Sequence, residues 1–314
     1  MTLTELRYLV NLDKERHFGH AAERSFVSQP TLSVAIKKLE DQLGVILFER
    51  VRGEVKPTPV GERIVQQAKR VLAEAKRVED LAREGQDELA GPLRFGAIYT
   101  VGPYLLPHLI PPLRQRAPHM PLVIEENFTA RLLEQLRDNE IDVVCVAIPI
   151  ENPQGLSIWP LYDEDFVVML PADHRWASES QITARRLAEE PLLLLGPGHC
   201  FRDQVIEACP KCVDPEASGP RPQTGSSLET IRHMVAGGLG LTVLPRSSVE
   251  NRPLEEVPLL VARPFANKAP SRRIALVWRR TFPRIKAIHA LREAILASAM
   301  RGVNFLPEAQ PSEG

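Results

Sequence analysis

The stretch of sequence that decides the fold of the N-terminal region is SQPTLSVAIKKLEDQL, residues 28–43. Its regularly spaced apolar residues are Leu32, Ile36, Leu39 and Leu43. Spacings of four, three and four residues predict a helix with one buried face. Ser28 can cap this helix, and Pro30 is tolerated in its first turn. The stretch therefore predicts an amphipathic helix whose opposite face is polar.

Two shorter helices are predicted upstream of this stretch. Thr2 and Glu5 fit a capping box that opens the first of them. Residues 17–23 predict the second, and its adjacent alanines allow another helix to pack close. Residues 26–27 form a tight connection to the third. This order of elements makes a helix-turn-helix, in which residues 28–43 are the recognition helix.

The polar face of the recognition helix carries the candidates for DNA contact. Glutamine and hydroxyl side chains near the start of such a helix suit base edges, and lysines further along suit phosphates. Residues 45–50 and 55–57 are predicted to be two strands of a wing beside the DNA backbone. The predicted DNA-binding residues are Ser28, Gln29, Pro30, Thr31, Ser33, Lys37, Arg50 and Arg52. The alternative is a generic helical hairpin with solvated lysines.

A long helix is predicted to follow this domain, which covers residues 1–58. Thr58-Pro59 caps and starts the helix. Its apolar seam consists of Ile64, Ala68, Val71, Ala75, Val78 and Ala82. Alternating spacings of four and three form a heptad pattern, which predicts that residues 59–90 link two copies of the chain. The alternative is a helix packed on its own domain.

Gly91-Pro92 ends that helix, and strands and helices alternate from there on. The predicted strands are Leu93–Ile98, Leu122–Glu126, Ile141–Ala147, Phe166–Leu170, Leu192–Leu195, Leu241–Leu244 and Ile274–Trp278. The predicted helices between or after them include Arg131–Arg137, Leu228–Ala236 and Ile285–Ala299. This alternation predicts an α/β effector domain with mostly parallel sheets over residues 91–300. Its expected parts are subdomain I (about 91–163 and 269–300) and subdomain II (about 164–268), with a cleft between them. A flexible tail is expected to follow the domain at 301–314.

Bulk properties set wide limits on the function. A chain of 314 residues is long enough for two or more domains. Charged residues appear within the first seven positions, which is not typical of a signal peptide, and no apolar stretch reaches the length of a membrane span. A cytoplasmic protein with reduced thiols is therefore expected. The net charge of −1 neither supports nor excludes a nucleic-acid partner, because an acidic remainder can dilute a basic patch.

The most distinctive motif of the effector domain is GHCFRDQV, residues 198–205, with a second thiol at Cys209. Cys200 lies between His199 and Arg202, where a predicted strand gives way to a helix. A guanidinium, a possible imidazolium and the free N–H groups of a helix N-terminus all favour the reactive thiolate. The second thiol could capture an oxidised first one. The alternative is two buried structural cysteines.

The spacing of the two thiols has a mechanical consequence. In one continuous helix, nine residues would separate Cys200 from Cys209 by about 13 Å along the axis. A disulfide needs Cα atoms closer than about 7 Å. Oxidation of this pair would therefore have to unwind the segment between them, which is the behaviour of a switch.

The N-terminal region resembles the LysR-type transcriptional regulators. The motifs that carry the resemblance are FGHAAE at 18–23, VSQPTLS at 27–33, IKKLE at 36–40, LFER at 47–50 and TPVG at 58–61. The resemblance implies a winged helix-turn-helix and an effector domain with the fold of periplasmic binding proteins. It also implies a DNA-binding regulator rather than an enzyme.

The effector domain is similar to the peroxide-sensing members of that family. The matching motifs are YTVGPYLLP at 99–107, GHCFRDQ at 198–204, Cys209 and SLETIR at 227–232. By resemblance, Cys200 is the peroxidatic cysteine and Cys209 the resolving one, with a peroxide pocket of Thr100, Thr129, His199, Arg202 and Asp203. The resemblance implies an activator of oxidative-stress genes that needs no cofactor and forms a homotetramer. The implied partners are double-stranded DNA, hydrogen peroxide, a thiol reductant such as glutaredoxin, and RNA polymerase. No association with a membrane is expected.

Cys209-Pro210-Lys211-Cys212 departs from this pattern by an additional thiol. Cys212 could compete for the oxidised Cys200 or pair with Cys209. A metal site of His199 and the three nearby cysteines is disfavoured, because adjacent residues of a loop or helix point in different directions. Cys145, in an apolar strand, is predicted to be core.

Three other functions remain open from the sequence. One is a LysR-type regulator that binds a small metabolite in the subdomain cleft, with inert cysteines. Another is a thiol peroxidase that uses Cys200, although an enzyme would not need the DNA module. A third is an assembly module built on the long helix.

Overall fold

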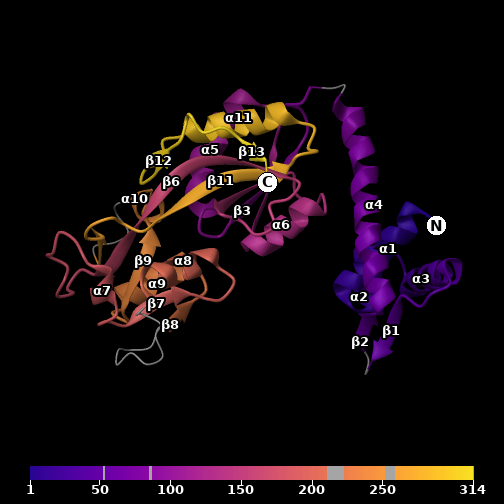
Figure 1. The fold of residues 1–314 in the computed structure, drawn as a ribbon, viewed down its shortest axis with the longest axis horizontal. Helices are drawn as coiled ribbons and strands as arrows, with labels where there is room; N and C mark the ends of the chain where they lie inside the picture. Colours follow the sequence, from indigo (N-terminus) through magenta and orange to yellow (C-terminus); the bar gives the residue numbers. More distant parts are fainter. Residues whose placement is uncertain (52–53, 85–86, 211–222, 252–258, 314) are drawn as a thin grey trace. The chain divides into compact units, whose positions relative to one another are not determined.

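The computed structural model describes residues 1–51, 54–84, 87–210, 223–251 and 259–313 (Figure 1). The chain divides into two compact units, residues 1–85 and 86–314. Among the described residues, no helix is long and apolar enough to cross a membrane.

The first unit is a winged helix-turn-helix followed by a long helix. Its elements are α1 (Leu3–Glu15), α2 (Phe18–Arg24), α3 (Gln29–Leu43), β1 (Phe48–Val51), β2 (Glu54–Pro57) and α4 (Pro59–Glu84). The hydroxyl of Thr2 accepts from Glu5 N while the Glu5 carboxylate accepts from Thr2 N, so the predicted capping box is confirmed. The Ser28 hydroxyl accepts from Thr31 N at 3.3 Å and caps α3. Leu32, Ile36 and Leu39 are buried, as the sequence predicts, whereas Leu43 at the end of the helix is 38% exposed.

The first half of α4 packs on its own unit. Val65 and Ala68 are 1% and 3% exposed within the core of the helix-turn-helix, and Ile64 and Val71 pack against that core. For this half, the alternative of a helix packed on its own domain is correct, because α1 lies against it. Val78, further along, is 68% exposed.

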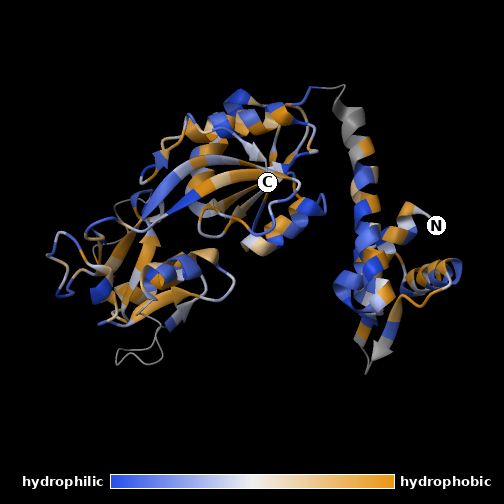
Figure 2. Ribbon diagram, in the orientation of Figure 1, coloured by the Kyte–Doolittle hydropathy of each residue, from blue (hydrophilic) through white to orange (hydrophobic). Residues whose placement is uncertain are grey.

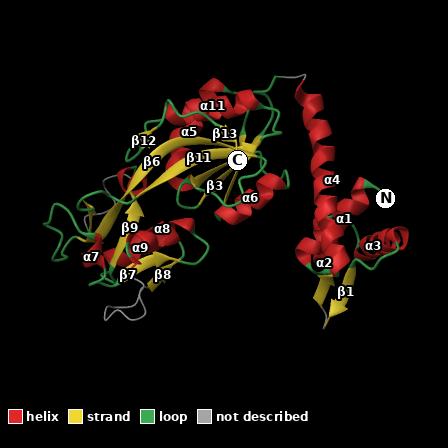
Figure 3. Ribbon diagram, in the orientation of Figure 1, coloured by secondary structure: helices red, strands yellow, loops and turns green. Residues whose placement is uncertain are grey.

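The second unit has one mixed sheet that runs through both subdomains (Figure 3). Its strand order is β4-β3-β5-β11-β6-β9-β7-β8. Subdomain I has β3 (Leu93–Ile98), β4 (Leu122–Asn127), β5 (Val143–Ile148), α5 (Gly102–Arg116), α6 (Thr129–Arg137) and α11 (Ile285–Leu296). Subdomain II has α7 (Ala184–Leu187), β7 (Leu192–Leu195), α8 (Cys200–Ala208), β8 (Gln223–Gly225), α9 (Leu228–Ala236), β9 (Leu241–Pro245), α10 (Arg246–Glu250) and β10 (Leu260–Pro264). Each subdomain has its own apolar core, which Figure 2 shows as orange strands.

Two long strands connect the subdomains, and they correct the prediction of mostly parallel sheets. β6 (Leu156–Pro171) pairs with β11 (Ser271–Arg279) through its first part and with β9 and β10 through its last part. All these pairs are antiparallel. Among the named strands of the described residues, the parallel pairs are β3 with β4 and β5, and β7 with β8 and β9.

The C-terminal segment is ordered, so the prediction of a flexible tail is wrong. β12 (Asn304–Phe305) and β13 (Ser312–Glu313) pair with β6. The indole N–H of Trp159 donates to Ala309 O at 2.7 Å. The physical reason is that β6 would otherwise present an unpaired edge, which folded sheets cover.

Candidate functional site

Cys200 lies at the strand-to-helix junction that the sequence predicts. Cys200 is the first residue of α8, directly after the turn that follows β7. Gly198 in that turn has φ +94°, and a Cβ there would lie 3.3 Å from the ring of Phe128, so the turn requires glycine. The first N–H groups of a helix have no partner within the helix, and they favour an anion at this end. Cys209 caps the other end of α8, so the helical separation argued from the sequence applies.

Cys200 lines a small cavity at the boundary between the subdomains. The cavity is lined by Ile98, Tyr99, Thr100, Asn127, Phe128, Thr129, Gly198, His199 and Cys200. Its volume of about 10 Å³ is near the minimum that a single water molecule requires. The hydroxyl oxygen of Thr129 is buried and has no hydrogen-bond partner. A buried polar group of this kind calls for a partner, and a small hydrogen-bonding molecule in the cavity can supply it.

His199 closes the cavity as a neutral ring. It is 9% exposed and packs edge-on against Phe128 and Tyr99, with ring centroids 4.8 Å and 5.9 Å away. Burial lowers the pKa of His199, and a hydrogen bond with the backbone of Ser226 only partly offsets this. The imidazolium considered in the sequence analysis is therefore disfavoured near pH 7, and His199 contributes packing and hydrogen bonding rather than charge.

Arg272 of β11 is a cation that interacts electrostatically with Cys200, and the sequence motifs did not reveal it. Its side chain is fully buried and donates to the hydroxyl of Thr100 at 2.7 Å and to the carbonyl of Thr100 at 2.9 Å. Burial lowers the pKa of Arg272, but the negative charges of Glu164, Tyr162 and Cys200 outweigh it and raise the pKa. A signal for it was present in the sequence, because Arg272 and Arg273 directly precede an apolar strand. Successive side chains of a strand point to opposite faces, so one of these two arginines must face inward.

The other two predicted pocket residues lie outside this cavity. Arg202 is half-buried and donates to Leu195 O at 2.8 Å, which ties α8 to the end of β7. Asp203 is exposed in the first turn of α8, where a carboxylate suits the helix dipole. Of the five predicted pocket residues, Thr100, Thr129 and His199 share the cavity with Cys200, whereas Arg202 and Asp203 do not line it.

The thiols of the chain differ sharply in state. Cys145 and Cys200 are free. Burial raises the pKa of Cys145 to about 12, so this thiol is protonated and inert. Cys209 is disulfide-bonded, and its Sγ lies 3.2 Å from Ala184 O. Cys212, for which the sequence predicts a role, lies outside the described residues.

The predicted DNA-binding residues gather around α3. Ser28, Gln29, Pro30, Thr31 and Lys37 are exposed, and Ser33 is half-buried. The side chain of Arg50 and the whole of Arg52 lie outside the described part of the chain.

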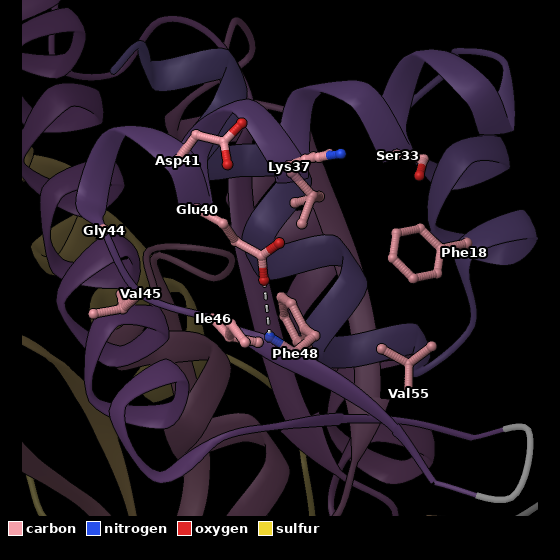
Figure 4. Close-up of a pocket in the computed structure, with 11 residues that line it drawn as sticks. Phe18, Ser33, Lys37, Glu40, Asp41, Gly44, Val45, Ile46, Phe48 and Val55 are labelled. Carbon is pink, nitrogen blue, oxygen red and sulfur yellow. Dashed lines mark hydrogen bonds between the residues drawn. The ribbon is translucent and has the colours of Figure 1, made fainter.

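The recognition helix is joined to the wing by one carboxylate. The Glu40 carboxylate accepts from Leu47 N at 2.7 Å and from Phe48 N at 3.3 Å. Figure 4 shows Ser33 and Lys37 on the wall of the pocket between α3 and the wing. The carboxylate therefore sets the position of the wing strand relative to the helix.

The class of protein follows from comparison of the two units with known families. Residues 3–62 match the bacterial regulatory helix-turn-helix protein model of the lysR family, and residues 86–300 match the LysR substrate binding domain. The chain belongs to the LysR family of bacterial transcriptional regulators.

Within that family, the chain is similar to proteins called OxyR. It is 41% identical to the DNA-binding transcriptional dual regulator OxyR of Escherichia coli over 95% of each chain. A full-length OxyR variant from Pseudomonas aeruginosa superposes with a TM-score of 0.74 at 50% identity, over 97% of this chain and 98% of that one. A hydrogen-peroxide-bound OxyR mutant from Corynebacterium glutamicum superposes with a TM-score of 0.62 at 36% identity, over 94% and 91% of the two chains.

Proposed function

We propose that this chain is a DNA-binding transcriptional regulator that senses hydrogen peroxide through Cys200. The observation that carries the proposal is the cavity, which sets a free thiol at a helix N-terminus beside the unpartnered hydroxyl of Thr129. The similarity to a relative called hydrogen peroxide-inducible genes activator supports it, at 41% identity over 89% of this chain.

The first chemical step oxidises Cys200. Peroxide enters the cavity and accepts or donates hydrogen bonds at Thr100, Thr129 and His199. The Cys200 thiolate attacks one peroxide oxygen, the O–O bond breaks, and the leaving hydroxide takes a proton to become water. Cys200 becomes a sulfenic acid and has lost the negative charge that Arg272 and the start of α8 stabilise.

The second step forms the disulfide. The Cys209 thiolate attacks the sulfur of the Cys200 sulfenic acid, the S–O bond breaks, and the leaving hydroxide takes a proton to become water. The helical separation requires α8 to unwind before the sulfurs meet. A Cys209 that is already disulfide-bonded must first be reduced before it can act as the resolving thiol. A thiol reductant such as glutaredoxin reverses the switch by thiol–disulfide exchange.

The conformational signal arises because α8 bridges the two subdomains. Phe201 and Val205 lie in the core of subdomain II, whereas the thiol of Cys200 packs against the core of subdomain I. His199 packs against Phe128 and Tyr99 of subdomain I. Unwinding α8 would remove these contacts and change how the subdomains are held together.

The change reaches DNA through the assembly of the chain. We propose that the far half of α4, around Ala75 and Val78, pairs two copies and that dimers join into a tetramer. Two or more recognition helices then bind one operator in double-stranded DNA, and the altered assembly promotes contact with RNA polymerase. The long helix is thus part of the regulator and not its whole function.

Two other functions are less well supported. A metabolite-binding site has typically about 300–1,000 Å³, far more than the cavity at Cys200. A thiol peroxidase would have to turn over many equivalents of peroxide per chain. The relatives are transcriptional regulators, which favours a response that stops after one equivalent.

The test is to treat the fully reduced chain with one equivalent of hydrogen peroxide, map its disulfides by mass spectrometry and footprint its DNA complex. We expect a Cys200–Cys209 bond and a changed footprint. Continued peroxide consumption with a constant footprint would instead indicate a peroxidase, and unmodified Cys200 would refute the proposal. A Cys200–Cys212 bond would keep the switch but assign resolution to the other thiol.

A further inference from the structure

A buried ion pair connects the cavity to the strands that join the subdomains. Glu164 of β6 and Arg272 of β11 lie directly opposite each other in the antiparallel ladder. Both side chains are fully buried, and Arg272 Nε lies 2.7 Å from Glu164 Oε2. Burying two charges is costly, so a pair of this kind needs further hydrogen bonds to be retained.

Each edge of the Arg272 guanidinium has a different partner. The Nε edge meets Glu164, and the two terminal nitrogens meet the hydroxyl and carbonyl oxygens of Thr100. The face of the guanidinium lies 5.1 Å from the ring of Phe201, the residue after Cys200. Because Thr100 holds only one edge, the contact with Glu164 fixes the rotation of the group.

Glu164 is itself held in place from subdomain II. Its second carboxylate oxygen accepts from Ser247 N at 3.1 Å, in the first turn of α10. The carboxylate thus joins subdomain II to an arginine that contacts a wall of the cavity.

We propose that Glu164 is a positioning residue for the reaction of Cys200 with peroxide, and that it acts by holding Arg272 against the hydroxyl and carbonyl oxygens of Thr100. This inference rests on the proposed peroxide reaction and adds a residue that does not touch the cavity. A carboxylate near a thiolate opposes the negative charge by simple electrostatics. Its electrostatic effect and its positioning effect therefore have opposite signs at Cys200, which makes them separable.

The test compares two reagents on the reduced full-length chain. Glu164→Gln retains an oxygen that can accept from Ser247 N but removes the charge that orients Arg272. We expect the rate of Cys200 sulfenic acid formation with peroxide to fall about tenfold. Alkylation of Cys200 by iodoacetamide, which needs no oriented peroxide, should stay within about twofold at neutral pH.

The matched control is the neighbouring pair on the same two strands. Asp163 and Arg273 are one residue away, contact at 2.6 Å and are partly exposed, at 33% and 49%. Asp163→Asn should leave both rates unchanged. A similar loss in this variant would show that any break in the β6–β11 ladder slows the reaction, and it would overturn the proposal.

A double-mutant cycle keeps the test valid if Glu164→Gln folds poorly. Arg272→Met combined with Glu164→Gln removes both buried charges, a replacement that buried pairs often tolerate. If Glu164 acts through Arg272, the second substitution should change the peroxide rate less than about twofold in the Arg272→Met background. An equal loss in both backgrounds would refute the inference. Wild-type Cys200 that fails to react with peroxide would instead refute the proposed function.

Discussion

Cys145 and Cys200 are both free thiols influenced by the same arginine, yet only one of them is placed to react. Arg272 lowers the pKa of Cys145, but complete burial outweighs this effect and raises the pKa to about 12. Cys200 is half-buried, lines a cavity and begins a helix. The comparison teaches that a nearby cation does not suffice to activate a thiol, because desolvation of the thiolate has to be limited as well.

The largest expected effect comes from exchanging the two thiols for hydroxyls in turn. Cys200→Ser should abolish the peroxide-induced change in the DNA footprint, whereas Cys145→Ser should retain it. The reason is that Cys200 lines the cavity at Thr100 and Thr129, whereas Cys145 is fully buried. Footprinting both variants with and without peroxide checks this, and a peroxide response that survives in Cys200→Ser would contradict the mechanism.

Removing the shared cation should affect the two thiols unequally. Arg272→Met should slow the reaction of Cys200 with peroxide at pH 7 on the order of tenfold, a factor that corresponds to about 1.4 kcal/mol. Cys145 should remain unreactive, because its burial is unchanged. Timed alkylation followed by peptide mass spectrometry measures both thiols in one sample. Rapid labelling of Cys145 in folded protein would show that burial does not protect it.

Removing the thiol of Cys209 should have a smaller effect than removing that of Cys200. Cys209→Ser should slow or divert disulfide formation without preventing oxidation of Cys200, and Cys212 can then take over part of the resolution. Trapping of the sulfenic acid with dimedone should increase in this variant. Cys212→Ser is the matched control, and equal trapping in both variants would mean that neither thiol resolves Cys200 alone.

The smallest expected effect is a pH dependence of stability from His199. Burial lowers its pKa below the usual 6.5, so the folded state binds fewer protons than the unfolded state between these values. The stability contribution is present above about pH 6.5 and is lost as the pH falls toward the lowered pKa. Melting temperatures of wild type and His199→Gln from pH 8 to pH 5 should therefore converge at the acidic end. Parallel curves would show that the folded protein binds protons at His199 as readily as the unfolded chain.

Local signals in the sequence were enough for the N-terminal domain and for the position of Cys200. The capping residues Thr2 and Ser28 and the apolar spacing of α3 act within one or two helical turns, and the structure confirms them. The predicted strands Leu93–Ile98 and Leu192–Leu195 agree with the observed bounds of β3 and β7. The strand predicted at Phe166–Leu170 was too short, because β6 covers Leu156–Pro171. Its first part is held in the sheet by pairing with β11, which lies far along the chain.

What the sequence by itself determined is the class of protein, the strand-to-helix junction at Cys200 and the presence of a second thiol one helix away. Only the tertiary structure decided that Arg272 and Glu164 reach the site, that His199 is buried and neutral, and that the C-terminal segment covers the edge of β6. The physical reason is that caps and periodicity are properties of neighbouring residues. The charge and burial at a cavity depend instead on strands such as β11, which return from far along the chain.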